Sequence, residues 1–159
     1  MKKIMNALFV VLFLLVSAKI SAQTSGSKDK PGKPDAKQEQ HISIENFPKN
    51  MPVNHLNGWG GMTVAINELP AGTDLSPLLE GLKNNSCQVP HWGYIIKGSL
   101  RLKYDDGKEV VLNAGDVFYM PPGHTAAVVE DLKILDFSPE KEMKGLINHI
   151  EKKIAGSKQ

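Results

Sequence analysis

The folded part of this sequence is marked by short runs in which apolar and polar residues alternate. The run MTVAINE at residues 62–68 and the run SLRLKY at residues 99–104 are typical of strands with one buried face. Turn-forming Gly, Pro, Asn and Asp residues separate the runs, as in Asp105-Asp106-Gly107. Short strands with regular turns predict an all-β sandwich or small barrel. The predicted strands cover residues 62–68, 88–97 with a break at Pro90, 99–104, 108–112, 117–120, 125–129 and 132–137.

The last part of the chain has a different periodicity, which predicts one amphipathic helix over residues 138–156. Ser138 is expected to be its N-cap, and Pro139 suits the first helical position. Apolar residues then recur at helical spacing and form one stripe, with lysines and glutamates elsewhere. We expect this helix to cover part of the β core or a partner's surface. The stripe consists of Met143, Leu146, Ile147, Ile150 and Ile154.

The first residues of the chain predict a secretory signal peptide over residues 1–22. Lys2 and Lys3 precede the apolar run Ala7–Ala18, in which Ser17 is the one polar residue, and the small residue Ala22 offers a cleavage point before Gln23. This run is shorter than the roughly 20 residues that a membrane-spanning helix needs. We therefore expect a secreted or periplasmic protein with no stable membrane insertion after signal cleavage.

The composition of the remaining chain separates a linker from a folded domain and argues against a nucleic-acid partner. Residues 23–40 carry no large apolar side chain and predict a disordered linker, which leaves residues 41–137 for the β-barrel. The whole chain has 19 basic and 17 acidic residues. The predicted signal peptide contains three of the lysines and no acid, so the rest has 16 basic and 17 acidic residues. Such a balance gives no drive for nucleic-acid binding.

Two motifs on this β background resemble those of the cupin superfamily. Tyr94–Gly98 (YIIKG) is similar to the strand and glycine that close the first cupin motif. Gly115-Asp116, followed after four residues by Pro121-Pro122-Gly123, is similar to the second motif. The longer pattern CQVPHWGY…PPGHT resembles a subgroup of small single-domain cupins. The resemblance implies a double-stranded β-helix, the cupin jelly-roll barrel, and a homodimer.

The sequence departs from the metal ligands that this resemblance implies. Metal-binding cupins carry two histidines and a glutamate in the first motif and another histidine in the second. The matching positions hold Asn85, Cys87, His91 and Ala126, and the nearby histidine of the second motif is His124. Two of the four positions therefore keep a plausible donor, and the third donor is displaced by two residues.

Cys87, His91 and His124 are nevertheless the predicted ligands of a divalent transition metal, with zinc favoured. Thiolate and imidazole are good donors for zinc and for the later first-row metals. Cys87 and His91 are an even number of residues apart and share one face of an extended strand, unless Pro90 bends the chain. The fourth donor is expected to be water, or one of the side chains His55 and Asp74.

Two other interpretations of these residues stay open. In the first, Cys87 is a small buried apolar residue, since one cysteine cannot form an internal disulfide. His91 is then a hydrogen-bonded neighbour of Trp92, and His124 is a surface turn residue. In the second, Cys87 is a nucleophile paired with His91, although the sequence identifies no third orienting residue.

A ligand site is predicted at the barrel mouth, formed by Trp92, Tyr94, Phe118 and Met120. Alternation places Phe118 and Met120 on the same face of their strand. The leading functional hypothesis is a secreted cupin that binds a metal ion and a small polar molecule, and that could transform the molecule by oxygenation, isomerisation or hydrolysis. The alternative is a metal-free ligand-binding or sensing module. The sequence does not decide whether the protein is an enzyme.

Overall fold

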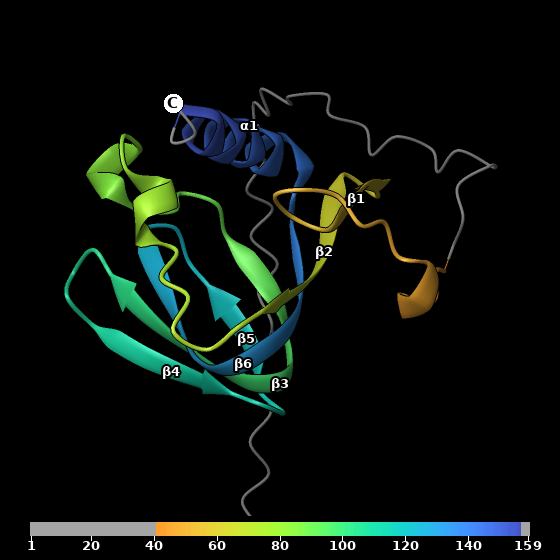
Figure 1. Ribbon diagram of the computed structural model, residues 1–159, viewed down its shortest axis with the longest axis horizontal. Helices are drawn as coiled ribbons and strands as arrows, with labels where there is room; N and C mark the ends of the chain where they lie inside the picture. Colours follow the sequence, from red (N-terminus) through yellow and green to blue (C-terminus); the bar gives the residue numbers. More distant parts are fainter. Residues whose placement is uncertain (1–40, 157–159) are drawn as a thin grey trace, which may run out of the picture. The chain divides into compact units, whose positions relative to one another are not determined.

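The computed structural model describes residues 41–156, which form an antiparallel β domain with one long C-terminal helix (Figure 1). The predicted signal peptide and linker, residues 1–22 and 23–40, lie outside the described residues. The elements are η1 Ile44–Asn46, β1 His55–Trp59, β2 Met62–Leu69, η2 Ser76–Leu79, η3 Lys83–Asn85, β3 His91–Tyr104, β4 Glu109–Asn113, β5 Val117–Met120, β6 His124–Pro139 and α1 Glu140–Gly156.

The two long strands β3 and β6 form the centre of the sheet. They pair with each other from Trp92↔Phe137 to Tyr104↔His124, and the hydrogen-bonded order is β1-β2-β6-β3-β4. The other edge of β3 is shared, because β5 pairs with its first residues and β4 with its last. All the pairings are antiparallel, so the predicted all-β jelly roll with a C-terminal helix is confirmed.

Two pairs of predicted strands are each one continuous strand in the structure. The run 88–97 and the run 99–104 join as β3, which begins only at His91, after Pro90, and the runs 125–129 and 132–137 join as β6. The register is irregular around Gly98, where φ is 76° and a Cβ atom would lie 2.2 Å from the carbonyl oxygen of Asp131. A bulge at a glycine bends a strand without ending it, which explains the difference.

The predicted start of the C-terminal helix is wrong by two residues. Ser138 and Pro139 are the last residues of β6, and α1 begins at Glu140. The reason is tertiary, because β2 continues to pair with β6 up to Met62↔Pro139 and holds both residues in the sheet. Ser138 is therefore a buried strand residue and does not cap the helix.

Apolar side chains gather in two separate clusters. The barrel cluster fills the interior between the strands, and the helix cluster lies between α1, η2 and the segment before β3. No helix within residues 41–156 has the length and apolar character to cross a membrane. The barrel cluster consists of Ile95, Leu100, Leu102, Phe118, Met120, Val128, Leu132 and Ile134. The helix cluster consists of Leu79, Cys87, Val89, Met143, Leu146, Ile147 and Ile150.

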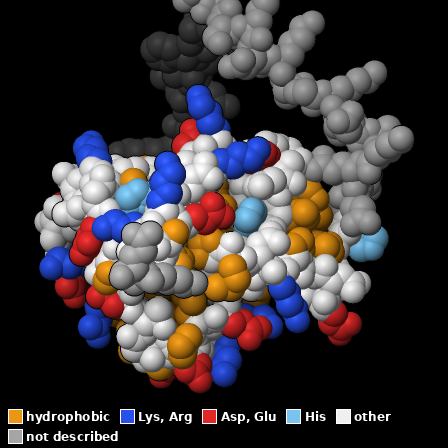
Figure 2. Space-filling model, turned by 45° about the horizontal axis from the view of Figure 1, so that its top comes forward, with side chains coloured by type: hydrophobic (Ala, Val, Ile, Leu, Met, Phe, Trp, Pro, Cys, Tyr) orange, Lys and Arg blue, Asp and Glu red, His pale blue; other side chains and the backbone are white. Residues whose placement is uncertain are grey.

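The surface mixes charges of both signs. On the face shown in Figure 2, lysine and arginine side chains lie interspersed with aspartate and glutamate and with scattered apolar groups. Individual ion pairs join strands or helices on the surface, such as Lys133 with Glu68 and Lys153 with Glu80. This interspersed distribution agrees with the near-balanced charge of the sequence after residue 22.

Candidate metal centre

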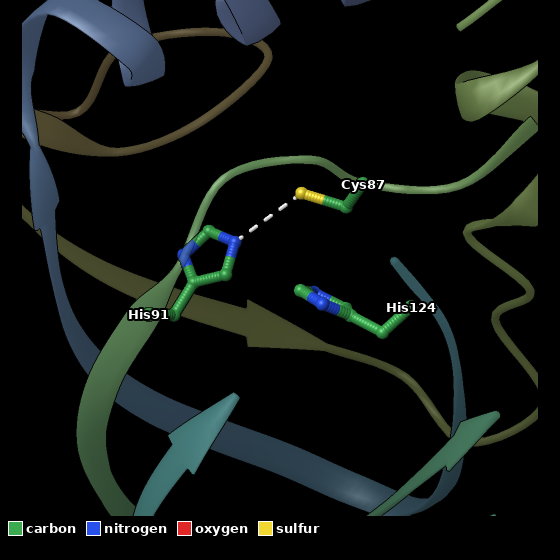
Figure 3. Close-up of side chains that lie close together, drawn as sticks. All are labelled: Cys87, His91 and His124. Carbon is green, nitrogen blue, oxygen red and sulfur yellow. Dashed lines mark hydrogen bonds between the residues drawn. The ribbon is translucent and has the colours of Figure 1, made fainter. Parts of the chain in front are cut away.

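Cys87, His91 and His124 converge at one point between the barrel and α1. Their potential ligand atoms all lie within 4.8 Å of one another, and all three side chains are buried. Figure 3 shows the three side chains directed toward a common space, with Cys87 on the segment before β3 and each histidine at the start of a long strand. The structure therefore brings together the three predicted ligands.

The backbone fixes Cys87 against the start of β6. The amide of Cys87 donates to the carbonyl oxygen of His124 at 2.8 Å, and the amide of Gly123 donates to the carbonyl oxygen of Cys87 at 2.7 Å. Just before Cys87 the chain turns through two residues with positive φ, Asn84 at 57° and Asn85 at 54°. Asparagine tolerates this left-handed region better than most residues, so the local sequence permits the turn that brings the cysteine back to the strand.

His91 is held on both sides of its ring. On one side, Nε2 lies 3.4 Å from Sγ of Cys87. On the other, Nδ1 lies 2.8 Å from Oγ of Ser138 and 3.5 Å from Oδ1 of Asp136. With the proton on Nδ1, the ring donates to these oxygens and leaves the Nε2 lone pair facing the sulfur.

His124 has its own backbone anchor. Its Nδ1 lies 2.7 Å from the carbonyl oxygen of Pro121. A carbonyl oxygen only accepts hydrogen bonds, so Nδ1 carries a proton, and in the neutral form of the ring the lone pair of Nε2 can bind a metal ion. The rings of His91 and His124 meet edge to face, with centroids 5.3 Å apart. Both histidines thus have the outer hydrogen bond that metal-ligating histidines almost always make.

The electrostatics of the pair favour a thiolate next to an imidazolium in the metal-free protein. Burial opposes ionisation of the thiol, but hydrogen bonds from His124 and His91 and the positive charge of the imidazole lower the pKa of Cys87 to about 6. Burial likewise opposes the imidazolium, but hydrogen bonding to Asp136 and Cys87 and their negative charges raise the pKa of His91 to about 9. A sulfur that is already ionised at neutral pH is a ready metal ligand.

The arrangement permits two kinds of chemistry. A thiolate and two imidazole nitrogens form the donor set of a three-ligand zinc or later first-row transition-metal site with one further position. The same Cys87–His91 pair could instead serve a nucleophilic thiol, and Asp136 with Ser138 provides the orienting group that the sequence did not reveal. The third donor, His124, favours metal binding, because a nucleophile and its base do not need a second imidazole beside the sulfur.

Asp136 and Ser138 are the functional residues that the sequence analysis missed. Both side chains are buried, at 9% and 1% exposure, and they follow Leu132 and Ile134 on the inward-facing side of β6. The observable signal was the continued alternation: two polar residues occupy positions where the strand pattern requires inward-facing apolar ones. The prediction that Ser138 caps the helix excludes it from the strand, so the strand pattern is not followed as far as this residue.

The suggested protein donors for the fourth position lie elsewhere. His55 is in β1, where its Nδ1 lies 2.8 Å from the carbonyl oxygen of Val53. Asp74 accepts hydrogen bonds from the amide and hydroxyl of Ser76. Among the described residues, the group that could hold a metal contains Cys87, His91 and His124 and neither of these two.

The four predicted ligand-binding residues do not share one surface. Trp92 and Tyr94 point outward from β3 and are 42% and 41% exposed, whereas Phe118 and Met120 belong to the barrel cluster. Trp92 stacks on Tyr119 of β5 on the outer face, with ring centroids 5.0 Å apart. Their role in binding a ligand stays a prediction.

A groove at the open edge between β4 and β5 lies next to the metal centre. Its volume is about 650 Å³. The buried Phe118 and the ring of Tyr104 line it, and Tyr104 also lies edge to face with the ring of His124, with centroids 6.3 Å apart. One lining residue of the groove therefore adjoins a candidate ligand. Its charged rim consists of Asp105, Asp106 and Lys108.

Comparisons with known proteins find one matching family and several similar solved structures. Residues 86–132 match the family described as Cupin domain, a segment that includes all three candidate ligands. No curated protein sequence matches the chain. Among solved structures, an RmlC-like cupin from Shewanella frigidimarina NCIMB 400 is 18% identical, with a TM-score of 0.47, and the match covers 64% of this chain and 92% of that one. An ethanolamine utilization protein Q from Salmonella typhimurium LT2 is 14% identical, with a TM-score of 0.42, over 55% of this chain and 68% of that one.

Proposed function

From the premise that this chain belongs to the cupin superfamily, we propose that it binds a transition-metal ion through Cys87, His91 and His124, with zinc favoured. The observation that carries the proposal is the convergence of three buried donor atoms within 4.8 Å of one another. One thiolate with two imidazoles suits zinc, because this ion accepts mixed sulfur and nitrogen donors in a tetrahedral arrangement. When bound, the ion supplies a Lewis acid at its fourth position.

The residues around the three donors prepare the site for such an ion. The outer hydrogen bonds of His91 and His124 hold both rings with Nε2 toward the shared space. Apolar clusters lie on both sides, since Cys87 belongs to the helix cluster and Met120 of the barrel cluster stands opposite His91 in the β3–β5 register. Apolar surroundings exclude water and strengthen the interaction of a cation with the thiolate.

Thermal unfolding with and without metal tests this function. We expect a chelator to lower the melting temperature of the unmodified protein and added zinc to restore it, because a metal that binds only the folded state stabilises it. His124→Ala should abolish both responses. His55→Ala is the matched control, since His55 also places Nδ1 against a carbonyl oxygen but lies outside the site. Identical responses of the two variants would contradict the proposal.

The groove beside His124 supports a small-molecule ligand as the second component of the function. A polar molecule in the groove, which has a volume of about 650 Å³, would meet the carboxylates of Asp105 and Asp106 and the ring of Tyr104. The alternative function, a metal-free binding or sensing module, uses the same groove. Metal-stripped protein that gains thermal stability from a small molecule would favour the alternative, whereas a gain that requires zinc would favour the joint site.

Two further proposals concern the location and assembly of the protein. We propose that it is secreted or periplasmic, on the strength of the first 22 residues, and N-terminal sequencing of the exported protein should find Gln23 first.

We also propose a homodimer, which the exposed Trp92, Tyr94 and Tyr119 on the outer sheet face support. Light scattering of the purified protein should then give twice the chain mass, and a monomer would contradict the homodimer.

A further inference from the structure

Asp136 is a buried carboxylate whose partners belong to the candidate metal centre. Its exposure is 9%, and within residues 41–156 its one ion pair is with His91, at 3.5 Å. Ser138 donates a hydrogen bond to its Oδ1 at 3.4 Å. Burying a charge is costly unless it is paired and hydrogen-bonded, so a carboxylate at this place requires a reason.

The hydrogen bonds connect this carboxylate to the candidate metal ligand. His91 Nδ1 donates to Oγ of Ser138 at 2.8 Å, and the same hydroxyl donates to Asp136. A hydroxyl that accepts from the ring and donates to a carboxylate has both roles fixed. The chain of two hydrogen bonds therefore keeps the proton on Nδ1 and directs Nε2 of His91 toward Cys87.

A count of formal charges shows what else Asp136 contributes. A divalent ion bound by one thiolate and two neutral imidazoles leaves one positive charge on the site. The carboxylate of Asp136 brings the total to zero. A monovalent ion on the same ligands gives no net charge without Asp136 and one negative charge with it. Because the three donors and Asp136 are all buried, the difference of one charge is weakly screened.

We propose that Asp136, acting through Ser138 on His91, is the positioning and charge-balancing residue that makes this site prefer a divalent ion over a monovalent one. The proposal rests on the metal binding proposed above. It also explains why a buried carboxylate lies 3.5 Å from Nδ1 of His91, the nitrogen that faces away from Cys87, although Asp136 is not one of the three donors.

The test compares two ions in an isosteric variant of the full-length protein. Asp136→Asn removes the charge and keeps the shape. The affinities for Zn(II) and for Ag(I), a soft monovalent probe, are measured by competition with chelators. We expect Zn(II) affinity to fall by about 10–100-fold, as losses of outer-shell partners typically do. Ag(I) affinity should stay close to that of the unmodified protein, because its neutral complex no longer faces an uncompensated carboxylate.

A second serine–carboxylate hydrogen bond, between β3 and β6, provides a control. Ser99 of β3 is buried and donates at 3.2 Å to the carboxylate of Glu130 of β6, which is exposed and lies away from the site. Glu130→Gln should leave both affinities unchanged. If Asp136→Asn fails to fold by circular dichroism, Asp136→Ser replaces it, and it should also weaken Zn(II) more than Ag(I), because it removes the same negative charge beside His91.

The outcomes separate this proposal from the one on which it rests. A loss confined to Zn(II) supports the role of Asp136. An equal loss for both ions would show a general structural role, and an unchanged Zn(II) affinity would show no role; either result overturns the proposal while the metal site itself stands. If the unmodified protein binds neither ion at Cys87, His91 and His124, the proposed function fails, and this inference fails with it.

Discussion

The two halves of the barrel interior are built from the same two strands and differ in what they enclose. In one half, β3 and β6 direct Leu100, Leu102 and Val128 inward, and the interior is hydrocarbon. In the other half, the inward positions of the same strands hold His91, Asp136 and Ser138. The strands β3 and β6 pair with each other in both halves, on either side of the bulge around Gly98, so the chemical difference lies in the inward side chains. A fold of this kind provides the frame, and a few inward polar residues make the site.

The boundary between the halves gives the prediction with the largest effect. Gly93 lies between His91 and Ile95 on β3, and a Cβ atom there would lie 2.1 Å from the carbonyl oxygen of Leu135 and 2.6 Å from the ring of Phe118. Gly93→Ala should lower the free energy of unfolding by about 3 kcal/mol or more, because backbone has to move. Urea denaturation measures the change.

A second glycine provides the control for that measurement. Gly145 in α1 has open space around it, so Gly145→Ala should be neutral or stabilising by up to about 1 kcal/mol. A similar small effect of Gly93→Ala would show that Gly93 is packed less tightly against Leu135 and Phe118 than the structure indicates.

The half that holds the candidate metal centre gives the next largest effect. Cys87→Ser should remove the stabilisation by zinc, which amounts to about 2.7 kcal/mol when free metal is 100 times its dissociation constant. Without metal the variant should remain folded, because serine is close to cysteine in size and the barrel cluster is untouched. Thermal unfolding at several zinc concentrations checks both statements. A Cys87→Ser protein that responds to zinc as strongly as the unmodified one would place the metal elsewhere.

Much of this comparison could be predicted from the sequence, because alternation fixes which side of a strand faces inward. It identified the β architecture, the helix and the three converging donors Cys87, His91 and His124. It could not show that β6 continues to Pro139, since that depends on pairing with β2, a contact distant in sequence. This is why the sequence does not reveal Ser138 and Asp136. By local preference Ser138 and Pro139 suit the start of a helix, but their pairing with β2 keeps them in the strand.

The pH dependence of metal binding sharpens the account of the polar half. At pH 7.5 Cys87, with a pKa of about 6, is ionised, whereas His91, with a pKa of about 9, carries a proton that the metal must displace. Zinc binding should therefore release about one proton. The number should fall toward zero as the pH rises through 9, and it should rise above one below pH 6, where the thiol is protonated. Calorimetry in buffers of different ionisation enthalpy counts the protons.

The smallest effect is expected from a substitution on the outer face of the sheet. Val117 on β5 is 82% exposed, next to the buried Phe118. Val117→Thr should change the free energy of unfolding by no more than about 0.5 kcal/mol and leave zinc affinity unaltered. Chemical denaturation and chelator competition measure these values. A larger loss of stability would place Val117 itself in the interface of the proposed homodimer.

The metal content of the protein purified without a histidine tag tests the central claim most directly. Elemental analysis of the unmodified chain is compared with that of a Cys87→Ser, His91→Ala double variant prepared in parallel. The account predicts close to one equivalent of a transition metal, zinc foremost, in the unmodified protein and none in the variant. Metal far below one equivalent in the unmodified protein, even after incubation with zinc and removal of the excess, would contradict it.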